Sequence, residues 1–307
     1  MNKEHYSKQL ANFCDFEMKH GLKGCNDKQI DERLSNIVNI FKCLNNKMIF
    51  QFEYLKKLTD RLITGKSGFL QAEQILINKL RAEQGITFVS KMTSMMQDLE
   101  SSKSIMDYYV NLTNHKGRPC DIQFKCQVLQ SGAWEIDKSK FEKYKLAQSL
   151  EYILDDFKSF YLRRQKTHKL MWVYGHGNVE IRFNYLKKPY QSISTLLQYS
   201  VLCLLEQIDL ESIANNNNNN KNTTVEYIAA KLQVAINTLI FDINGLIFNP
   251  NFNPKKDLKC GIISTNLSSN NEEIKENTKI WLNHDFNSNI LKICTIPILF
   301  KVINIYN

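Results

Sequence analysis

The stretch from residue 77 to residue 103, INKLRAEQGITFVSKMTSMMQDLESSK, predicts two helices separated by a single glycine. Apolar side chains recur every three or four residues on both sides of Gly85, which places each set on one face of a helix. Glycine readily adopts the left-handed conformation that ends a helix. Because short amphipathic helices are not stable alone, we expect this pair to pack against other helices.

Two more apolar stripes of the same period precede this pair. The first consists of Leu34, Ile37, Val38, Phe41 and Leu44, and the second of Ile49, Phe52, Leu55, Leu58 and Leu62. Asn45 and Asn46 lie between the stripes, and asparagine is a favoured helix cap. Four stripes joined by short connections predict a helical bundle over residues 1–118.

The apolar period changes near residue 120. From there Ile122, Phe124, Cys126 and Val128 alternate with polar residues, which predicts a strand at 122–129 with one buried face. Residues 170–174 and 179–185 alternate around the turn GHGN and predict a hairpin. We also expect helices at 141–163, 190–207 and 224–240 and a last strand at 290–296. The fold class is therefore α+β and mainly α.

Composition limits the setting in which the chain works. No apolar run is long enough to cross a bilayer, and the first residues, MNKEHYSKQL, lack the apolar core of a secretory signal. We expect a cytoplasmic or nuclear protein, where thiols stay reduced. The eight cysteines form no C-x-x-C pair, so we expect neither a metal site nor a cofactor, although Cys14, His20 and Cys25 leave a zinc site conceivable. The asparagine tract at 215–220 predicts a polar loop insertion.

No motif for catalysis is present, so we expect a protein that is not an enzyme. The sequence has no phosphate-binding loop and no H-E-x-x-H, and the adjacent Asp155 and Asp156 would point to different faces of a helix. The net charge of +9 instead favours acidic partners. The basic residues cluster in three groups: Lys56, Lys57, Arg61 and Lys66; Lys79 and Arg81; and Arg163, Arg164, Lys166 and Lys169. They form either a solvated face or a surface for an acidic partner.

Several motifs together resemble the cullin family, and within it the SCF-type cullin most. They are FKCLNNKMIFQFEYLKKLTDRLITGKS (41–67), AEQILINKLRAEQGITFVSKMTSMMQDLESSKSI (72–105), CQVLQSGAW (126–134) and FKSFYLRRQKTHKLMWVY (157–174). The match is specific from about residue 8 to residue 200 and weaker beyond. Residues 165–168 read QKTH, where the family pattern has His-x-Gly-Arg, and Glu135 stands where the family has proline. From the resemblance we expect the chain to lack the family's N-terminal repeat arm and its C-terminal neddylation module.

The resemblance implies a four-helix bundle followed by an α/β cullin-homology platform with a winged-helix-like segment. The domains would be the bundle at 1–118, the first part of the platform at 119–189, the winged-helix-like segment at 190–248 with its asparagine-rich insertion, and an Asn/Ser-rich loop with the last strand at 249–307. A chain of this kind would be a non-catalytic scaffold of a ubiquitin ligase in ubiquitin-dependent protein catabolism. It would bind a RING-box protein by strand addition.

The resemblance also implies partners and site residues. The residues expected to bind the RING partner are Ile122, Phe124, Cys126, Val128, Leu170, Trp172, Tyr174 and Ile181. Those expected to attract an acidic partner are Lys56, Lys57 and Arg61. A ubiquitin-conjugating enzyme would be reached through the RING partner, whereas adaptor, membrane and nucleic-acid binding are not expected. Two alternatives stay open: a truncated, non-functional cullin fragment, or a basic nucleic-acid-binding helical protein, for which we find no helix-turn-helix signature.

Overall fold

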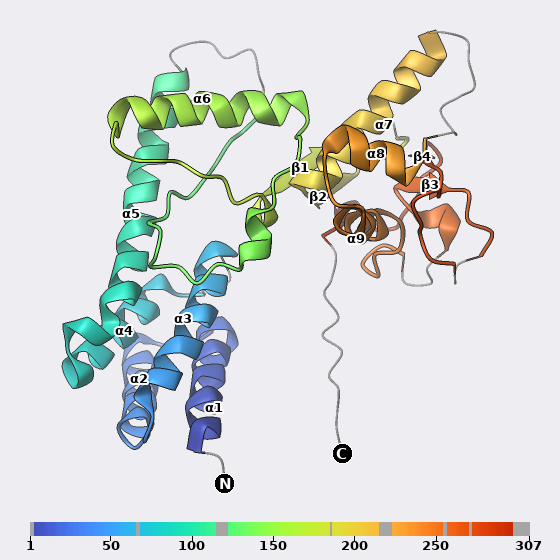
Figure 1. Cartoon of the computed structure of the whole chain (residues 1–307). Helices are drawn as coiled ribbons and strands as arrows, with labels where there is room; N and C mark the ends of the chain where they lie inside the picture. Colours follow the sequence, from blue (N-terminus) through green and yellow to red (C-terminus); the bar gives the residue numbers. More distant parts are fainter. Residues whose placement is uncertain are drawn as a thin grey trace. The chain divides into compact units, whose positions relative to one another are not determined.

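The computed structural model describes residues 3–65, 68–114, 122–184, 186–214, 223–253, 257–269 and 272–296 (Figure 1). The chain divides into two compact units, Met1–Asp137 and Lys138–Asn307, and each is described by itself. Helices dominate both units, and strands occur only as short segments among the described residues. None of the described helices combines the length and the apolar character that a membrane span requires.

The first unit is a bundle of helices. Its elements are α1 (Lys3–Phe16), a π-helical turn (Glu17–Gly21), α2 (Asp27–Lys42), α3 (Lys47–Ile63), α4 (Leu70–Gln84) and α5 (Ile86–Asn114). Asn26 caps α2 through a reciprocal bond with Gln29, and the side chain of Asn46 caps α3. Gly85 separates α4 from α5 at a φ of 82°. The helices predicted on either side of this glycine are therefore confirmed.

The apolar stripes of the bundle meet in one core. Helix α1 packs beside α3, α2 beside α4, and α4 against α5. Leu34, Phe41, Leu58 and Leu80 from the predicted stripes are all fully buried there. The core also includes Trp134, which lies after the last helix of the unit. The predicted helical bundle is thus present, and residues beyond its last helix complete it.

The second unit begins with helix and coil and continues into two small sheets. Its elements are a 3₁₀ turn (Lys138–Phe141), α6 (Gln148–Arg164), a 3₁₀ turn (Tyr174–His176), β1 (Asn178–Arg182), β2 (Gln191–Thr195), α7 (Leu196–Ala214), α8 (Val225–Leu232), α9 (Ile236–Ile247), a 3₁₀ turn (Leu258–Cys260), β3 (Ile263–Thr265), β4 (Ile280–Leu282) and β5 (Lys292–Cys294). In one sheet β2 pairs antiparallel with β1 and parallel with β5. In the other, β3 pairs antiparallel with β4.

Two predicted strands and two predicted helices need correction. Residues 122–129 and 170–173 belong to no helix or strand, and Tyr174 begins a 3₁₀ turn. Strand β1 pairs with β2 rather than with residues 170–174. The hairpin predicted around GHGN was therefore wrong. The helix expected at 190–207 begins only at Leu196, because Gln191–Thr195 forms β2. The helix expected at 224–240 is broken at Gln233, which has a left-handed φ of 53°.

This break creates a helix-turn-helix, which the apolar pattern did not predict, within the winged-helix-like segment that the resemblance implied. Helices α8 and α9 pack together around the turn at Gln233. The N–H of Val225 donates to Thr278 O at 3.0 Å, which pairs the start of α8 with the chain entering β4. The order of α7, α8, α9 and the β3–β4 hairpin is that of a winged helix, and its core is built around Val201, Ile228 and Ile243.

Candidate protein-binding site

An extended segment, residues 122–130, lies along α5 in the first unit (Figure 1). Its even-numbered side chains are half-buried and its odd-numbered ones are exposed up to Gln127, which is the alternation that the sequence predicts. The ring of Phe124 packs edge-on against Tyr109 of α5 with centroids 6.1 Å apart. The Sγ atom of Cys126 lies 3.5 Å from the Sδ atom of Met106. The segment therefore has the side-chain pattern of a strand without a strand pairing.

Two polar residues of α5 hold this segment in place. Ser102 Oγ donates to Val128 O and accepts from the Val128 N–H, each at 2.8 Å. Asp98 Oδ2 accepts from the Gln130 N–H at 2.8 Å and from Trp134 Nε1 at 2.7 Å. Sequence reasoning gave these two residues no role. Their spacing of four, continued by Met106, places them on one face of a helix and is the signal that could have identified them.

The bonds at Val128 fix the direction of the main chain. In an extended chain the N–H and C=O groups of successive residues point to opposite sides. The N–H and C=O groups of Val128 point to α5. The N–H and C=O groups of Gln123, Lys125 and Gln127, which are an odd number of residues away, therefore point away from α5. These three residues form no main-chain hydrogen bond with any residue in the described ranges. The segment thus presents a row of open donors and acceptors, which we call the open edge.

The second unit contains the other residues expected to bind the RING partner. Leu170, Trp172, Tyr174 and Ile181 are all half-buried. Trp172 packs on Phe157 of α6 with ring centroids 5.9 Å apart, and Tyr174 packs on Tyr144 at 5.2 Å. Ile181 lies on β1 and packs against the core of the unit. The structure therefore places Trp172, Tyr174 and Ile181 against residues of the second unit. The other four, Ile122 to Val128, lie in the first unit.

Strand β1 also has an outward edge. The N–H of Phe183 donates to Tyr190 O at 3.0 Å. In an antiparallel pair the main-chain groups of every second residue point to the neighbouring strand, so those of Ile181 and Val179 also point to β2. The main-chain groups of Glu180 and Arg182 consequently point away from β2. Among the described strands β1 pairs with β2 alone, so no described strand pairs with these groups. Each unit thus carries main-chain groups that an added strand could pair.

The residues expected to attract an acidic partner separate into two environments. Lys56 is exposed and its Nζ lies 4.2 Å above the ring of Phe52, while Lys57 is half-buried. Arg61 is fully buried, and this corrects its assignment to the surface. Its Nε donates to Glu73 Oε1 at 2.7 Å and its Nη1 to Asp15 Oδ1 at 2.8 Å. Its charge is therefore neutralised inside the bundle.

This buried ionic cluster is structural. Tyr54 OH donates to Glu73 Oε2 at 2.9 Å, and burial, reinforced by the Glu73 carboxylate, raises the pKa of Tyr54. Burial acts to raise the pKa of Asp15 as well, but hydrogen bonds from Lys19 and Arg61 outweigh it and lower that pKa. Cys14 lies in the same core, and its burial raises the pKa of the thiol to about 12. This pKa keeps the thiol protonated at neutral pH, and a protonated thiol is a poor nucleophile.

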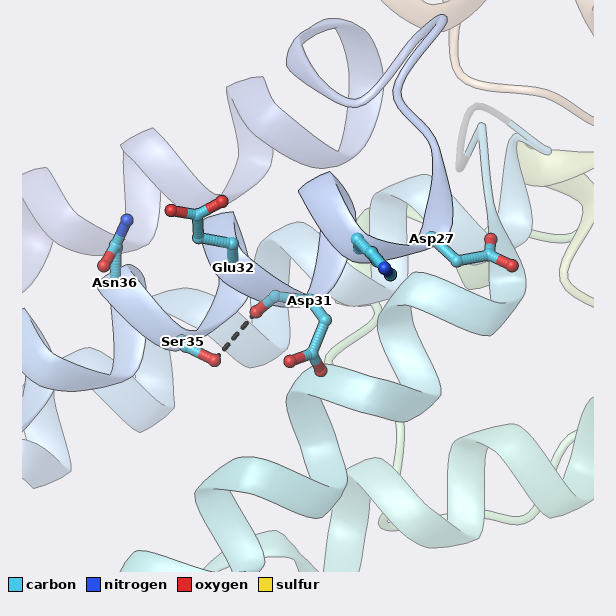
Figure 2. A pocket seen from close by; sticks show the side chains of 6 residues that line it. Asp27, Asp31, Glu32, Ser35 and Asn36 are labelled. Carbon is cyan, nitrogen blue, oxygen red and sulfur yellow. Dashed lines mark hydrogen bonds between the residues drawn. The ribbon is translucent and has the colours of Figure 1, made fainter.

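A shallow hollow on α2 is lined by acidic and polar side chains, including Asp27, Asp31, Glu32 and Ser35 (Figure 2). Ser35 Oγ donates to Asp31 O at 2.8 Å. Lys79 Nζ lies 2.8 Å from Asp31 Oδ1 and donates to Ser35 Oγ at 3.0 Å. These groups join α2 to α4, so the hollow is part of the bundle contact. Within the described ranges no three His, Cys, Asp or Glu side chains are placed to hold a metal ion.

The helix-turn-helix is poorly suited to nucleic acid. Its second helix, α9, contains no lysine or arginine, although phosphate contacts supply most of the affinity of such modules. Thr238 Oγ1 on α9 instead donates to Glu142, with 3.1 Å to Oε2. Phe241 is the large side chain that α9 exposes. The second helix of this module therefore offers no cation for phosphate contacts.

Comparisons with known proteins identify the family. Residues 1–106 match the family model described as the cullin alpha solenoid domain, and residues 128–286, more than half of the chain, match the cullin alpha+beta domain. The chain belongs to the cullin family. Both units of this cullin chain are covered, and residues 122–127 of the open edge lie between the two matched regions.

Curated cullins of several types are similar to the chain. Cullin-1 of Dictyostelium discoideum is 26% identical over 95% of the chain and 36% of its own length. Cullin-4A of Mus musculus is 30% identical over 65% of the chain and 26% of its own length. Cullin-2 of Caenorhabditis elegans is 26% identical over 66% of the chain and 28% of its own length. The chain thus spans between about a quarter and about a third of these relatives.

Proposed function

We propose that this cullin chain is a non-catalytic scaffold subunit of a cullin–RING ubiquitin ligase, and that it binds a RING-box protein by strand addition. It would act in ubiquitin-dependent protein catabolism, in an SCF-type assembly, in the cytoplasm or nucleus. The RING partner would bring the ubiquitin-conjugating enzyme, so the scaffold itself would need no catalytic group. Membership of the cullin family supports the scaffold role.

The open edge is the observation that carries this proposal. Residues 122–128 have the burial alternation of a strand, yet three residues point their main-chain groups away from α5 without a described partner. Main-chain polar groups that are not paired within a fold are normally satisfied by water or by another chain. An extended peptide laid along this edge would pair them and gain affinity from main-chain hydrogen bonds.

The interaction is tested by a matched pair of variants at Lys125. Lys125→Pro removes the outward N–H, whereas Lys125→Ala keeps it and removes only the exposed side chain. Residue 125 lies outside every helix and strand, in an extended segment that tolerates proline. We expect Lys125→Pro to weaken binding of a purified RING-box protein about tenfold or more in a calorimetric titration, because a buried carbonyl of the partner loses its donor.

The matched control decides between main-chain and side-chain recognition. Lys125→Ala should bind within about a factor of two of the unsubstituted chain, since exposed side chains contribute little. Equal affinities for the alanine and proline variants would exclude pairing at this edge. A folded chain that binds no RING-box protein at micromolar concentrations would favour the non-functional fragment instead.

The acidic-partner surface is a second, weaker part of the proposal. Lys56 is exposed and Lys57 half-buried on α3, whereas Arg61 cannot take part because it is buried. Electrostatic attraction of this kind speeds association and is screened by salt. Lys56→Glu should therefore slow association of an acidic peptide at low salt, and an unchanged rate would remove this surface from the account.

A further inference from the structure

The end of α6 is the most basic part of the second unit. Lys158, Arg163, Arg164, Lys166 and Lys169 fall within twelve residues, and no aspartate or glutamate occurs between residues 157 and 179. Arg163 and Arg164 lie in the last turn of α6, where cations complement the helix dipole. That explanation does not extend to Lys166 and Lys169, which lie beyond the helix. The cluster also includes the residues that depart from the cullin pattern, QKTH at 165–168.

Thr167 stands at the centre of this cluster on an exposed turn. The N–H of His168 donates to Gln165 O at 3.1 Å, so Lys166 and Thr167 are the two central residues of the turn. The ring Nδ1 of His168 lies 3.0 Å from Tyr161 OH, which ties the turn back to α6. Thr167 is exposed, and its hydroxyl forms no hydrogen bond with the residues that the structure describes. The hydroxyl is therefore accessible to an enzyme.

We propose that Thr167 is a phosphorylation site for a protein kinase that selects basic substrates. Arg164 lies three residues before the acceptor, and kinases discriminate their substrates by charge patterns of this type. In the reaction the γ-phosphoryl group of ATP is transferred to Thr167 Oγ1, ADP leaves, and the hydroxyl proton passes to the catalytic aspartate of the kinase. The turn is held by the main-chain bond from His168 to Gln165 and by the contact of His168 with Tyr161, and opening so small a set of bonds for the kinase costs little.

The surrounding cations would hold the phosphate once it is attached. A phosphothreonine carries about −1.5 to −2 charges near neutral pH and three strong acceptor oxygens. Arg163, Lys166 and Lys169 are exposed side chains within four residues of Thr167. Charge-assisted hydrogen bonds from these groups would replace mutual repulsion by attraction and order the end of α6. Phosphorylation would thus act as a local clamp on the turn.

The site is tested on the full chain with a calcium/calmodulin-dependent protein kinase and ATP, followed by mass-spectrometric mapping. We expect Thr167 to be the principal site and Thr167→Ser to remain a substrate. Arg164→Lys keeps the charge but loses the guanidinium fork, and it should lower the initial rate about fivefold or more. Lys169→Ala removes a charge on the other side of the acceptor and should change the rate less than about twofold.

Three results would overturn the site. They are no incorporation into the folded chain, incorporation mainly at other residues, or equal losses in Arg164→Lys and Lys169→Ala. The contact between the phosphate and the surrounding cations is measured separately by ³¹P NMR of the phosphorylated chain. Its second pKa should lie below the ordinary value of about 6 and return toward it in Lys166→Gln. A second pKa at or above 6 in the unsubstituted chain would contradict the clamp.

Discussion

Replacing Arg61 by methionine should destabilise the first unit far more than removing a surface cation. The guanidinium is fully buried, donates twice to Glu73 at 2.7 and 3.0 Å and donates once to Asp15 at 2.8 Å. Removing one partner of a buried ion pair leaves the opposite charge uncompensated and costs about 3–5 kcal/mol. Since a domain of this size is stable by about 5–15 kcal/mol, the loss would be a large part of the total.

The matched control is Lys42→Met in the same bundle. Lys42 Nζ lies 2.8 Å from Glu83 Oε1, a distance like those of Arg61, but both side chains are about a third or more exposed. Exposed pairs contribute about 0–1 kcal/mol. The double variant Arg61→Met with Glu73→Met should recover about 2 kcal/mol or more, because the buried carboxylate is then gone.

The assay is urea unfolding followed by hydrogen-exchange mass spectrometry, which reports on each unit through its own peptides. Peptides from α3 and α4 should lose protection at lower urea in Arg61→Met, while those from α7 and α9 should not change. If Arg61→Met costs no more than Lys42→Met, the buried cluster contributes nothing particular and the reasoning fails.

Two further perturbations test other parts of the structure. Burial raises the pKa of Asp242 from 3.8 to about 6, although the hydrogen bond from Thr195 Oγ1 opposes this rise. The folded state therefore disfavours the ionised carboxylate. The free energy of unfolding of the second unit should rise by up to about 3 kcal/mol as the pH falls from 7 to 4. Asp242→Asn should be more stable than the unsubstituted chain at pH 7 and lack this dependence, and a unit that loses stability between pH 7 and 5 would contradict the sign. Asp98→Ala should cost about 2–4 kcal/mol by removing the acceptor of Gln130 N and Trp134 Nε1, and should shift Trp134 fluorescence to the red; unchanged emission would show that Asp98 does not anchor the segment.

The helical bundle could be predicted because the residues that specify each of its helices lie within or beside that helix. The stripes from Leu34 to Leu62 follow the helical period, and Asn46 and Gly85 act as a cap and a stop within a few residues of the helices they delimit. The alternation at 122–128 likewise predicted which side chains are half-buried. It could not predict pairing, since alternation specifies the buried face and a strand needs a neighbour.

The errors came from features set by residues distant in sequence. Arg61 looked like a surface cation beside Lys56 and Lys57, and its burial depends on Glu73 and on Asp15, 46 residues away. The apolar pattern read residues 224–240 as one helix because Gln233, not glycine, takes the left-handed conformation at the turn between α8 and α9. The partner of β1 is β2 across a loop, a choice made by the packing of the second unit rather than by the turn at GHGN.

Amide hydrogen exchange along residues 122–130, with and without a RING-box protein, tests the strand-addition account most directly. The amides of Gln123, Lys125 and Gln127 should exchange fast in the free chain and slow about tenfold or more on binding, because an added strand would pair them. Binding that leaves these three amides as fast as before would place the partner elsewhere and contradict the account.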